Sequence, residues 1–450
     1  MIAPGFLRAR AWIVCFIILA FVRPAANAGR TEMPSGLWKI PPERFTLATG
    51  IPCIYQKNTS SPATVVGLFV DGGKAAVPAG LDGLATMSTR LLLEIPDEGK
   101  VRDLMSQATR LSYLCLEDCS VILIECLSGN LEEALRVAAK IIQDPLISGL
   151  RVGRAKELMT ANGKVEEDDA VAAAHNAVMG AFYGGRGYGS VLYGTGPSLK
   201  AIERKDVLAF NRRLFVKSNV FFCVQSDLGR DSVRRLLESS FDSLPDGRTA
   251  DLPVQDAVLP EVRDVNLIKK TKQTYVGRAF ALPRTDLAAM ARGYILETLL
   301  GKGPGSRLWA LRAEERLAYG VDADLTWTKS SGILVAYLET GRSKAGEAAA
   351  ALDRALSALR AGGVTEEEME ATRTMARARL LRATEAKSPR LRMIGLFETL
   401  GPGAEALSGL LAAVDGVTRD DLNGFAREVL DPAQALRVTV GPGPEGPAER

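Results

Sequence analysis

The feature that most constrains the fold is an internal repeat whose two copies lie 215 residues apart, about half the length of the chain. Residues 202–215 align without a gap with residues 417–430, and each segment leads into a short apolar run. The identical pairs are Arg204 with Arg419, Asp206 with Asp421, Phe210 with Phe425 and Arg212 with Arg427. A period this long exceeds that of a solenoid unit and predicts two domains of one fold. The chain is also too long for a single hydrophobic core.

The two predicted halves share an order of elements, with strands first and grouped helices after them. Strands are predicted at 65–70 and 274–280, a hairpin at 111–128, and further strands near 319–328 and 331–340. Helices are predicted at about 82–94, 100–109, 131–143, 151–165 and 169–182, and at about 286–300, 306–316, 344–360, 365–385 and 389–399. Consecutive strands followed by grouped helices are typical of α+β domains.

Domain boundaries follow from the same pattern. We expect a first domain at 39–245, a polar, proline-bearing linker at 246–262, a second domain at 263–440 and a disordered tail at 441–450. Residues 1–28 are predicted to be a secretory signal peptide, because two arginines precede an apolar run that ends in Ala-Asn-Ala. The mature chain is therefore expected in the periplasm, free of the membrane; an uncleaved anchor is the alternative.

Charge and cysteine content restrict the function classes. Lys and Arg total 56 against 53 Asp and Glu, which gives no electrostatic case for nucleic acid or an anionic membrane surface. Cys115 and Cys119 flank a predicted hairpin turn, so a cross-turn disulfide and a pair of buried thiols are both open. The spacing of the cysteines does not match a zinc finger or ribbon.

A candidate binding pair lies behind a glycine-rich turn. Arg312 and Tyr319 are two helical turns apart, and a helix from Ser306 to about Glu315 would direct both toward one side. A guanidinium and a phenol there could bind a carbonyl or carboxylate. The alternative interpretation is a solvated charge and a packing residue.

Several motifs, in order along the chain, resemble the pitrilysin-type zinc metallopeptidases, the family of insulin-degrading enzyme and mitochondrial processing peptidase. They are the glycine-rich turn before Ser306-Arg307-Leu308, Leu311-Arg312 followed by Leu317-Ala318-Tyr319, Asp168-Asp169, and the stretch from Tyr193-Gly194-Thr195 to Phe210. The resemblance covers roughly residues 40–440. It implies two homologous domains, each a mainly antiparallel sheet packed with helices, arranged as a clam-like pair.

The family's zinc motif is degenerate in this chain. In the family, an inverted His-x-x-Glu-His motif follows a Gly-Leu-Ala lead-in, and a downstream Glu completes the ligand set. Here Gly83-Leu84-Ala85 is followed by Thr86, Thr89 and Arg90 at the motif positions, and Asn162 stands at the third-ligand position. The single histidine, His175, is interpreted as a structural or surface residue, and Glu166 to Asp169 as a solvated acidic face.

The resemblance implies a division of labour between two chains. Family members often work in pairs, and Arg312 and Tyr319 match the Arg and Tyr that face a partner's zinc. We therefore expect a non-catalytic subunit with no metal or cofactor of its own, whose partner is a homologous zinc-bearing peptidase and whose ligand is a peptide. Gly303 and Gly305 are expected to let the backbone approach that peptide, or else to form only a flexible helix lead-in.

Two other function classes remain at this stage. One is a stand-alone peptide-binding or assembly protein without proteolytic activity. The other is independent hydrolysis by Ser306 or a cysteine, which ranks last because no histidine is paired with either nucleophile.

Overall fold

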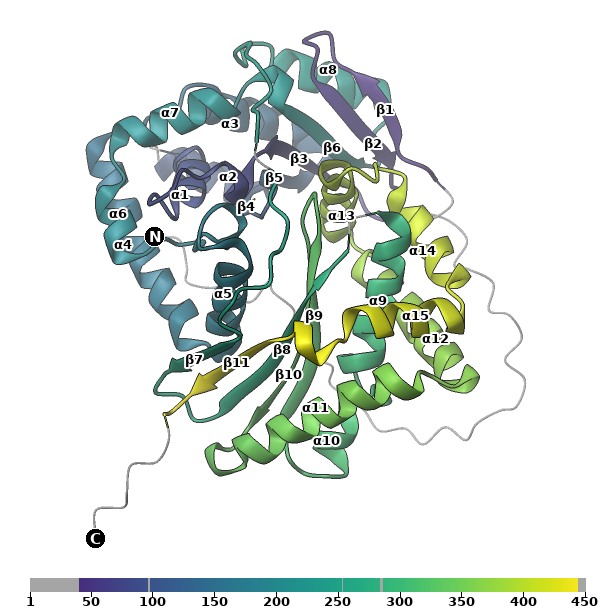
Figure 1. Cartoon of the computed structure of the whole chain (residues 1–450). Coiled ribbons are helices and arrows are strands. Elements are labelled where there is room, and N and C mark those ends of the chain that lie inside the picture. Colours follow the sequence, from purple (N-terminus) through teal and green to yellow (C-terminus); the bar gives the residue numbers. More distant parts are fainter. Residues whose placement is uncertain (1–39, 96–97, 253, 284–285, 444–450) are drawn as a thin grey trace. The chain divides into compact units, whose positions relative to one another are not determined.

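The computed structural model describes residues 40–95, 98–252, 254–283 and 286–443 (Figure 1). The predicted signal peptide and residues 444–450 of the predicted tail lie outside these ranges. Within them, no helix is both long enough and apolar enough to span a membrane.

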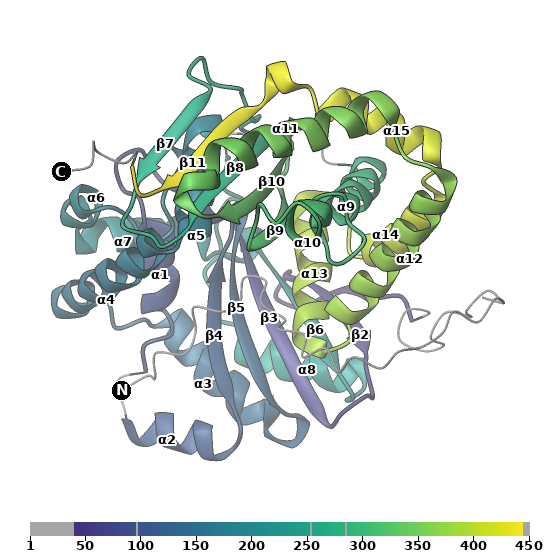
Figure 2. The same ribbon diagram turned by 90° about the horizontal axis from the view of Figure 1, so that it is seen from below.

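Two mainly antiparallel sheets form the frame of the described chain, as Figures 1 and 2 show from two directions. The first has the strand order β1-β2-β6-β3-β5-β4 and the second β7-β11-β8-β10-β9. The first sheet consists of β1 (Glu43–Thr46), β2 (Pro52–Lys57), β3 (Ala63–Asp71), β4 (Arg110–Cys115), β5 (Cys119–Leu127) and β6 (Val220–Ser226). The second consists of β7 (Asp264–Ile268), β8 (Thr274–Leu282), β9 (Gly320–Trp327), β10 (Gly332–Thr340) and β11 (Leu436–Gly441).

The two sheets have the same topology, apart from the additional strand β1. In each, one parallel pair, β2 with β6 or β7 with β11, joins an antiparallel meander that ends at β4 or β9. The α+β class and the duplicated architecture predicted from the repeat are confirmed.

The helices also match the predicted pattern closely, and the five predicted in the first half are α1 to α5. These are α1 (Leu84–Leu91), α2 (Glu98–Ser106), α3 (Leu131–Gln143), α4 (Gly149–Asp168) and α5 (Ala170–Tyr183). The remaining helices of that half are α6 (Gly196–Ala201), α7 (Arg204–Leu214) and α8 (Arg230–Ser240). The second half holds α9 (Leu287–Gly301), α10 (Trp309–Ala313), α11 (Ala345–Gly362), α12 (Glu366–Ala383), α13 (Lys387–Leu400), α14 (Ala406–Gly416) and α15 (Arg419–Val429).

The repeat segments 202–215 and 417–430 contain equivalent capped helices. Asp206 of α7 and Asp421 of α15 each occupy the third helical position and accept a hydrogen bond from the backbone N–H of the N-cap residue. This reciprocal capping satisfies donors that a helix N-terminus otherwise leaves unpaired. Shared capping therefore explains why this part of the repeat is visible in the sequence.

The helix predicted at 306–316 is present but shorter than predicted, because α10 spans only Trp309–Ala313. No side chain caps its N-terminus, and Glu314 and Glu315 follow its C-terminus, where negative charge is unfavourable. Arg316 then adopts a left-handed conformation with φ of 54°, which turns the chain out of the helix. Arg312 and Tyr319 are therefore not successive residues on one helical face.

Helices α5 and α13 occupy equivalent places in the two halves, and each packs on the sheet of the other half. Helix α5 contacts β8 and β11, whereas α13 contacts β3 and β6 (Figure 1). At the second contact Gly395 approaches Phe69 so closely that an added Cβ would lie 2.0 Å from the ring. Lys387 further ties α13 to the first half by donating to the carbonyl oxygens of Ser61 (2.7 Å) and Ala63 (2.6 Å).

The cysteines of the described chain, Cys53, Cys115, Cys119, Cys126 and Cys223, are free and buried. Cys115 pairs across the hairpin with Ser120, whereas Cys119 lies opposite Asp71 on β3. Of the two alternatives for Cys115 and Cys119, the structure therefore has buried thiols, which behave as small apolar side chains.

The segment predicted as a linker, 246–262, carries no helix or strand in its described part. It nevertheless packs against both halves. Val258 donates its backbone N–H to the Phe182 carbonyl (3.1 Å), and the Gln255 carbonyl accepts from the Ser330 hydroxyl (2.6 Å).

Candidate functional site

The degenerate metal-motif helix α1 is packed as a structural element. Its two motif threonines are almost fully buried, and their hydroxyls donate to backbone carbonyls, Thr86 to Leu192 (2.6 Å) and Thr89 to Ala85 (2.9 Å). Gly83 precedes the helix with φ of 89°, and a Cβ there would lie 2.9 Å from the Gly194 nitrogen. The helix is therefore fixed against the 192–194 loop.

The other two motif positions carry groups that do not suit a zinc ion. The Arg90 guanidinium lies 3.7 Å from the Glu94 carboxylate, and it opposes the burial that raises the pKa of Tyr113. Asn162 is half-buried on α4. Zinc is held by imidazole, thiolate or carboxylate, whereas these positions supply two bonded hydroxyls, a guanidinium and an amide. The residues present do not fit the family's metal.

A wider search gives no alternative ligand set within the described ranges, where no three His, Cys, Asp or Glu side chains lie together as a metal-binding group. His175 is half-buried on α5. In the acidic run that precedes it, Asp169 caps α5 by accepting from the backbone of Val171 (2.9 Å) and Ala172 (3.0 Å). Its neighbours Glu167 and Asp168 are exposed.

Arg312 lies exposed on α10, where its guanidinium stacks on an indole. The guanidinium carbon is 4.7 Å from the ring centroid of Trp309, one helical turn earlier. A cation over an aromatic face is held in a defined orientation at little cost in hydration. Trp309 was not identified from the sequence, although its i−3 spacing from Arg312 on a predicted helix would have indicated the contact.

Tyr319 precedes the edge strand β9 and is 63% exposed. Its backbone N–H donates to the Glu339 carbonyl at 2.8 Å, which extends the β9–β10 pairing by one residue. The phenol oxygen lies near Gly341, the residue that follows β10, since it would be 3.6 Å from a Cβ built on that glycine. No hydrogen bond or ring contact joins it to Arg312 among the described residues, so the two predicted groups are separate exposed positions.

The glycine-rich turn connects α9 to α10 and combines open and tightly packed glycines. Gly303 and Gly305 have φ values of 92° and 115°, and a Cβ on either would have no neighbour within 4 Å. Gly301 is buried instead, and an added Cβ would lie 2.1 Å from the Ala323 nitrogen. Gly301 thus allows α9 to contact the backbone of β9 directly, while the other two glycines shape an accessible turn.

A partly buried charge network lies beneath this turn and was not predicted. The Lys302 ammonium lies 2.8 Å from Asp322, 3.1 Å from Asp324 and 3.6 Å from Glu297. Arg379 of α12 reaches Glu297 as well, at 3.1 Å. The pattern that could have revealed it is the Asp322-x-Asp324 alternation, which puts both acids on one face of a strand.

Two opposing effects determine the pKa values in the network, namely burial of the charged groups and the opposite charges beside them. Burial opposes the charge on Lys302, but the carboxylates of Glu297, Asp324 and Asp322 outweigh it and raise the pKa of Lys302. Burial raises the pKa of Glu297 and of Asp322, and the neighbouring cations oppose both shifts. The network therefore fixes α9, the glycine-rich turn and β9 to one another.

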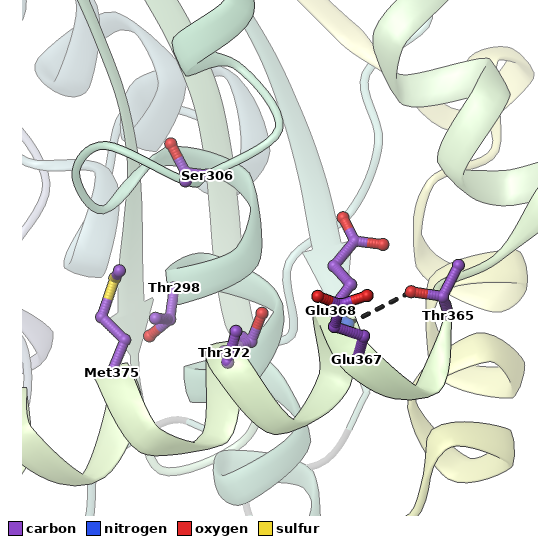
Figure 3. A pocket seen from close by; sticks show the side chains of 9 residues that line it. Thr298, Ser306, Thr365, Glu367, Glu368, Thr372 and Met375 are labelled. Carbon is purple, nitrogen blue, oxygen red and sulfur yellow. Dashed lines mark hydrogen bonds between the residues drawn. The ribbon is translucent and has the colours of Figure 1, made fainter. Parts of the chain in front are cut away.

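A pocket of about 380 Å³ lies between this turn and α12 (Figure 3). Its polar lining consists of the side chains of Thr298, Ser306, Thr365, Glu367, Glu368 and Thr372, and its apolar lining includes Ala371 and Met375. In the second half it occupies the place, between α9 and α12, that the degenerate metal motif occupies between α1 and α4.

Comparison with known proteins gives one match to a family profile. Residues 201–375 match the family described as "Peptidase M16 inactive domain". This match includes the glycine-rich turn, Arg312 and Tyr319.

Two similar bacterial proteins extend the match over most of the chain. An uncharacterized zinc protease, YmxG, from Bacillus subtilis is 19% identical over 88% of this chain and 97% of its own length. A second, ML0855 from Mycobacterium leprae, is 21% identical over 89% of this chain and 91% of its own length.

Solved structures share the fold at low sequence identity. A peptidase M16 inactive domain from Pseudomonas fluorescens superposes with a TM-score of 0.81 at 18% identity, covering 90% of this chain and 99% of that one. A protease from Helicobacter pylori gives 0.82 at 16% identity, covering 90% and 100%. A chain of complex III2 from Candida albicans gives 0.78 at 14%, covering 89% and 95%. Together with the duplicated fold and the degenerate motif, these matches support the assignment of the chain to the M16, or pitrilysin-type, peptidase family, as a member of the non-catalytic type.

Proposed function

We propose that this chain is the non-catalytic subunit of a periplasmic heterodimeric zinc metallopeptidase. In this proposal a homologous partner carries the zinc ion and the general base, and this chain contributes Arg312 and Tyr319 to the binding of an extended peptide. The observation that carries the proposal is the contrast between the buried, hydroxyl-bonded α1 and the exposed Arg312 and Tyr319 beside the edge strand β9.

The chemistry of these two residues suits that role. A guanidinium offers five donors and keeps its charge at all relevant pH values, and a phenol adds one donor. Both can bind the carbonyl oxygen of a peptide and stabilise negative charge that develops on it. Because Arg312 already stacks on Trp309, less conformational entropy is lost when it binds.

The fold is compatible with a subunit role. A chain of the same fold is part of complex III2 of Candida albicans, a multi-subunit assembly. The residues at the family's metal positions support a dependence on a partner, because they supply no zinc ligand.

The test is reconstitution with a homologue that carries an intact His-x-x-Glu-His motif. The isolated chain should leave a panel of peptides uncleaved, while the mixture should cleave them in a chelator-sensitive manner. Arg312→Ala should reduce kcat/KM of the mixture by about tenfold to a hundredfold, the loss of one charge-assisted contact, and Tyr319→Phe by less.

Arg316→Ala is the matched control, because Arg316 is an exposed arginine four residues further along. It should leave kcat/KM unchanged. Undiminished activity after Arg312→Ala and Tyr319→Phe together would reject the shared site. A chain that binds the same peptides equally well with no partner, and whose partner gains nothing from it, would instead be a stand-alone peptide-binding protein.

A further inference from the structure

We propose that the pocket between the glycine-rich turn and α12 binds a primary ammonium group, supplied by a lysine side chain or by the N-terminus of a peptide. The inference rests on the proposed peptide-binding function only for the source of the ammonium. The pocket's own residues determine the chemical class of its ligand.

The first argument comes from charge. Two carboxylates line the pocket, but Arg307 neutralises one of them through a two-point contact with Glu368, in which its Nη2 donates at 2.6 Å. Glu367, by contrast, has no basic group within 4.0 Å among the described residues. The exposed Glu367 therefore adds to the pocket lining one carboxylate without a bonded cation, which favours a cation over an anion.

The second argument comes from two hydroxyls that the protein itself leaves unsatisfied. Thr372 is 6% exposed and directs its hydroxyl from α12 into the pocket, where no described residue forms a hydrogen bond with it (Figure 3). Ser306 is 7% exposed, and its Oγ is buried without a hydrogen-bond partner in the described chain. Because the Ser306 Oγ is shielded from solvent, the Thr372 hydroxyl is the one that a ligand can reach directly, and a ligand that donates to it satisfies an acceptor that the described chain leaves unused.

The third argument concerns the hydrogen-bonding groups and the shape of the ligand. An ammonium group has three donors and no acceptor, which matches a lining of hydroxyl and carboxylate oxygens. Ala371 and Met375 supply an apolar wall for a methylene chain. An anion is disfavoured here, although the pocket includes the first turn of α12, because that turn carries Glu366, Glu367 and Glu368.

The pocket also lies where it could bind one side chain of a peptide that passes over the turn. Gly305 and Ser306 line it on the side of the turn, two and three residues after the open glycine Gly303. A main chain that passes over the turn could insert one side chain beneath it.

The direct test is methyl NMR of the isolated chain with methionine labelled at its methyl carbon. The Met375 resonance, assigned with Met375→Leu, should shift on addition of Nα-acetyl-lysine N-methylamide. It should respond at least about fivefold more weakly to the norleucine analogue, which lacks the ammonium. The methyl group of Met105, which is 71% exposed and outside the pocket, serves as the internal control.

Norleucine N-methylamide with a free α-amino group separates the two sources of the ammonium. A response to this probe alone would assign the pocket to a peptide N-terminus, and a response to the acetylated lysine probe alone would assign it to a side chain. Both results support the proposal. Equal shifts with all three probes, or no shift with any, would overturn it.

A matched pair of variants tests the role of the carboxylate. Glu367→Gln should reduce the preference for lysine over norleucine to less than about twofold. Glu366→Gln changes the adjacent exposed acid, which does not line the pocket, and should leave the preference intact. Equal preference in Glu367→Gln and the unmodified chain would contradict the assignment.

The same variants distinguish this proposal from the proposed function. In the reconstituted mixture, peptides with lysine or norleucine at one position should be cleaved with different KM values if the pocket reads substrate. Cleavage that depends on Arg312 but is indifferent to lysine would retain the shared site and reject the pocket as a substrate subsite. An ammonium response in NMR without any cleavage would retain the pocket and reject the shared site.

Discussion

Helices α1 and α9 hold equivalent positions in the two halves, yet they bury their polar groups in different ways. Each packs between an edge strand, β4 or β9, and a long helix, α4 or α12. On α1 the buried groups are neutral hydroxyls, such as those of Thr86 and Thr89, bonded to backbone carbonyls. Around α9 they are ions, with Glu297 and Lys302 at its C-terminal end.

The polar groups of α1 therefore serve packing, whereas those around α9 are charged and depend on the exact placement of their partners. A neutral hydroxyl bond contributes only about 1 kcal/mol, and its loss can be absorbed locally. A buried ion pair costs desolvation energy on both sides and is sensitive to the loss of either partner. The first half thus carries packed hydroxyls at the family's metal positions, whereas the second half has a charge network that fixes the glycine-rich turn against β9.

The largest expected effect comes from removing the cation of the second-half network. Lys302→Met leaves Glu297 with Arg379 and leaves Asp322 and Asp324 without a bonded cation. Because the two aspartate side chains are 34% and 39% exposed, water screens part of the effect, and the free energy of unfolding should fall by about 2–4 kcal/mol. Urea unfolding followed by tryptophan fluorescence measures this loss.

Two further variants control that experiment. Lys302→Arg should retain most of the stability, because the positive charge stays. Lys200→Met, at an exposed lysine, should change the free energy of unfolding by less than about 0.5 kcal/mol. A loss below about 1 kcal/mol in Lys302→Met would show that the network does not differ energetically from the hydroxyl contacts of α1.

The next effect concerns the place where equivalent turns of the two halves meet. Asp118 in the β4–β5 turn accepts hydrogen bonds from the Tyr188 hydroxyl (2.5 Å) and from the backbone of Lys329 (3.0 Å), which lies in the β9–β10 turn. Burial raises the pKa of Asp118 to about 6, against the favourable contacts with Tyr188 and Lys329 and with a small contribution from Glu117.

This raised pKa gives a signed pH dependence. Because the folded chain binds the Asp118 proton more tightly than the unfolded chain, its contribution to stability is complete below about pH 4 and is lost as pH rises through about 6. The loss should amount to about 2–3 kcal/mol. Asp118→Asn should remove this component, measured as the difference between the two stability curves from pH 4 to pH 7. Parallel curves for the two proteins would contradict it.

Most of the fold could be predicted from the sequence because local patterns determine it. The predicted helix at 131–143 corresponds to α3, and the strands near 319–328 and 331–340 correspond to β9 and β10. The overextension of α10 has a local cause as well, the left-handed residue Arg316, which no sequence pattern marked.

The candidate site was less predictable, because it depends on contacts between distant segments. Lys302 lies in a turn whose glycines predicted a backbone role rather than a charged one. Its partners on β9 are about twenty residues further along the chain. The Thr372 hydroxyl forms no hydrogen bond within its own helix among the described residues. It becomes a candidate ligand-binding group only because α12 packs beneath the turn. The order of elements predicted both α5 and α13. It could not predict that each of them packs on the sheet of the other half, because that is a tertiary contact.

The smallest effect is also the most direct comparison, since it removes one hydroxyl from each of the two equivalent helices. Thr86→Val on α1 leaves the Leu192 carbonyl without its donor and removes a weak hydrogen bond with the Cys115 thiol, so it should cost about 1 kcal/mol of unfolding free energy. Thr298→Val on α9 removes an acceptor from the Arg379 guanidinium as well as a donor to the Tyr294 carbonyl, so it should cost about 2 kcal/mol. Urea unfolding of both variants at pH 7 gives the difference. If Thr86→Val costs as much as Thr298→Val, the two helices do not differ in how they hold their buried polar groups. If Thr298→Val costs clearly more than Thr86→Val, the charges around α9 increase the free energy that a neighbouring hydroxyl contributes. This is expected where a charged donor loses its partner in a buried site.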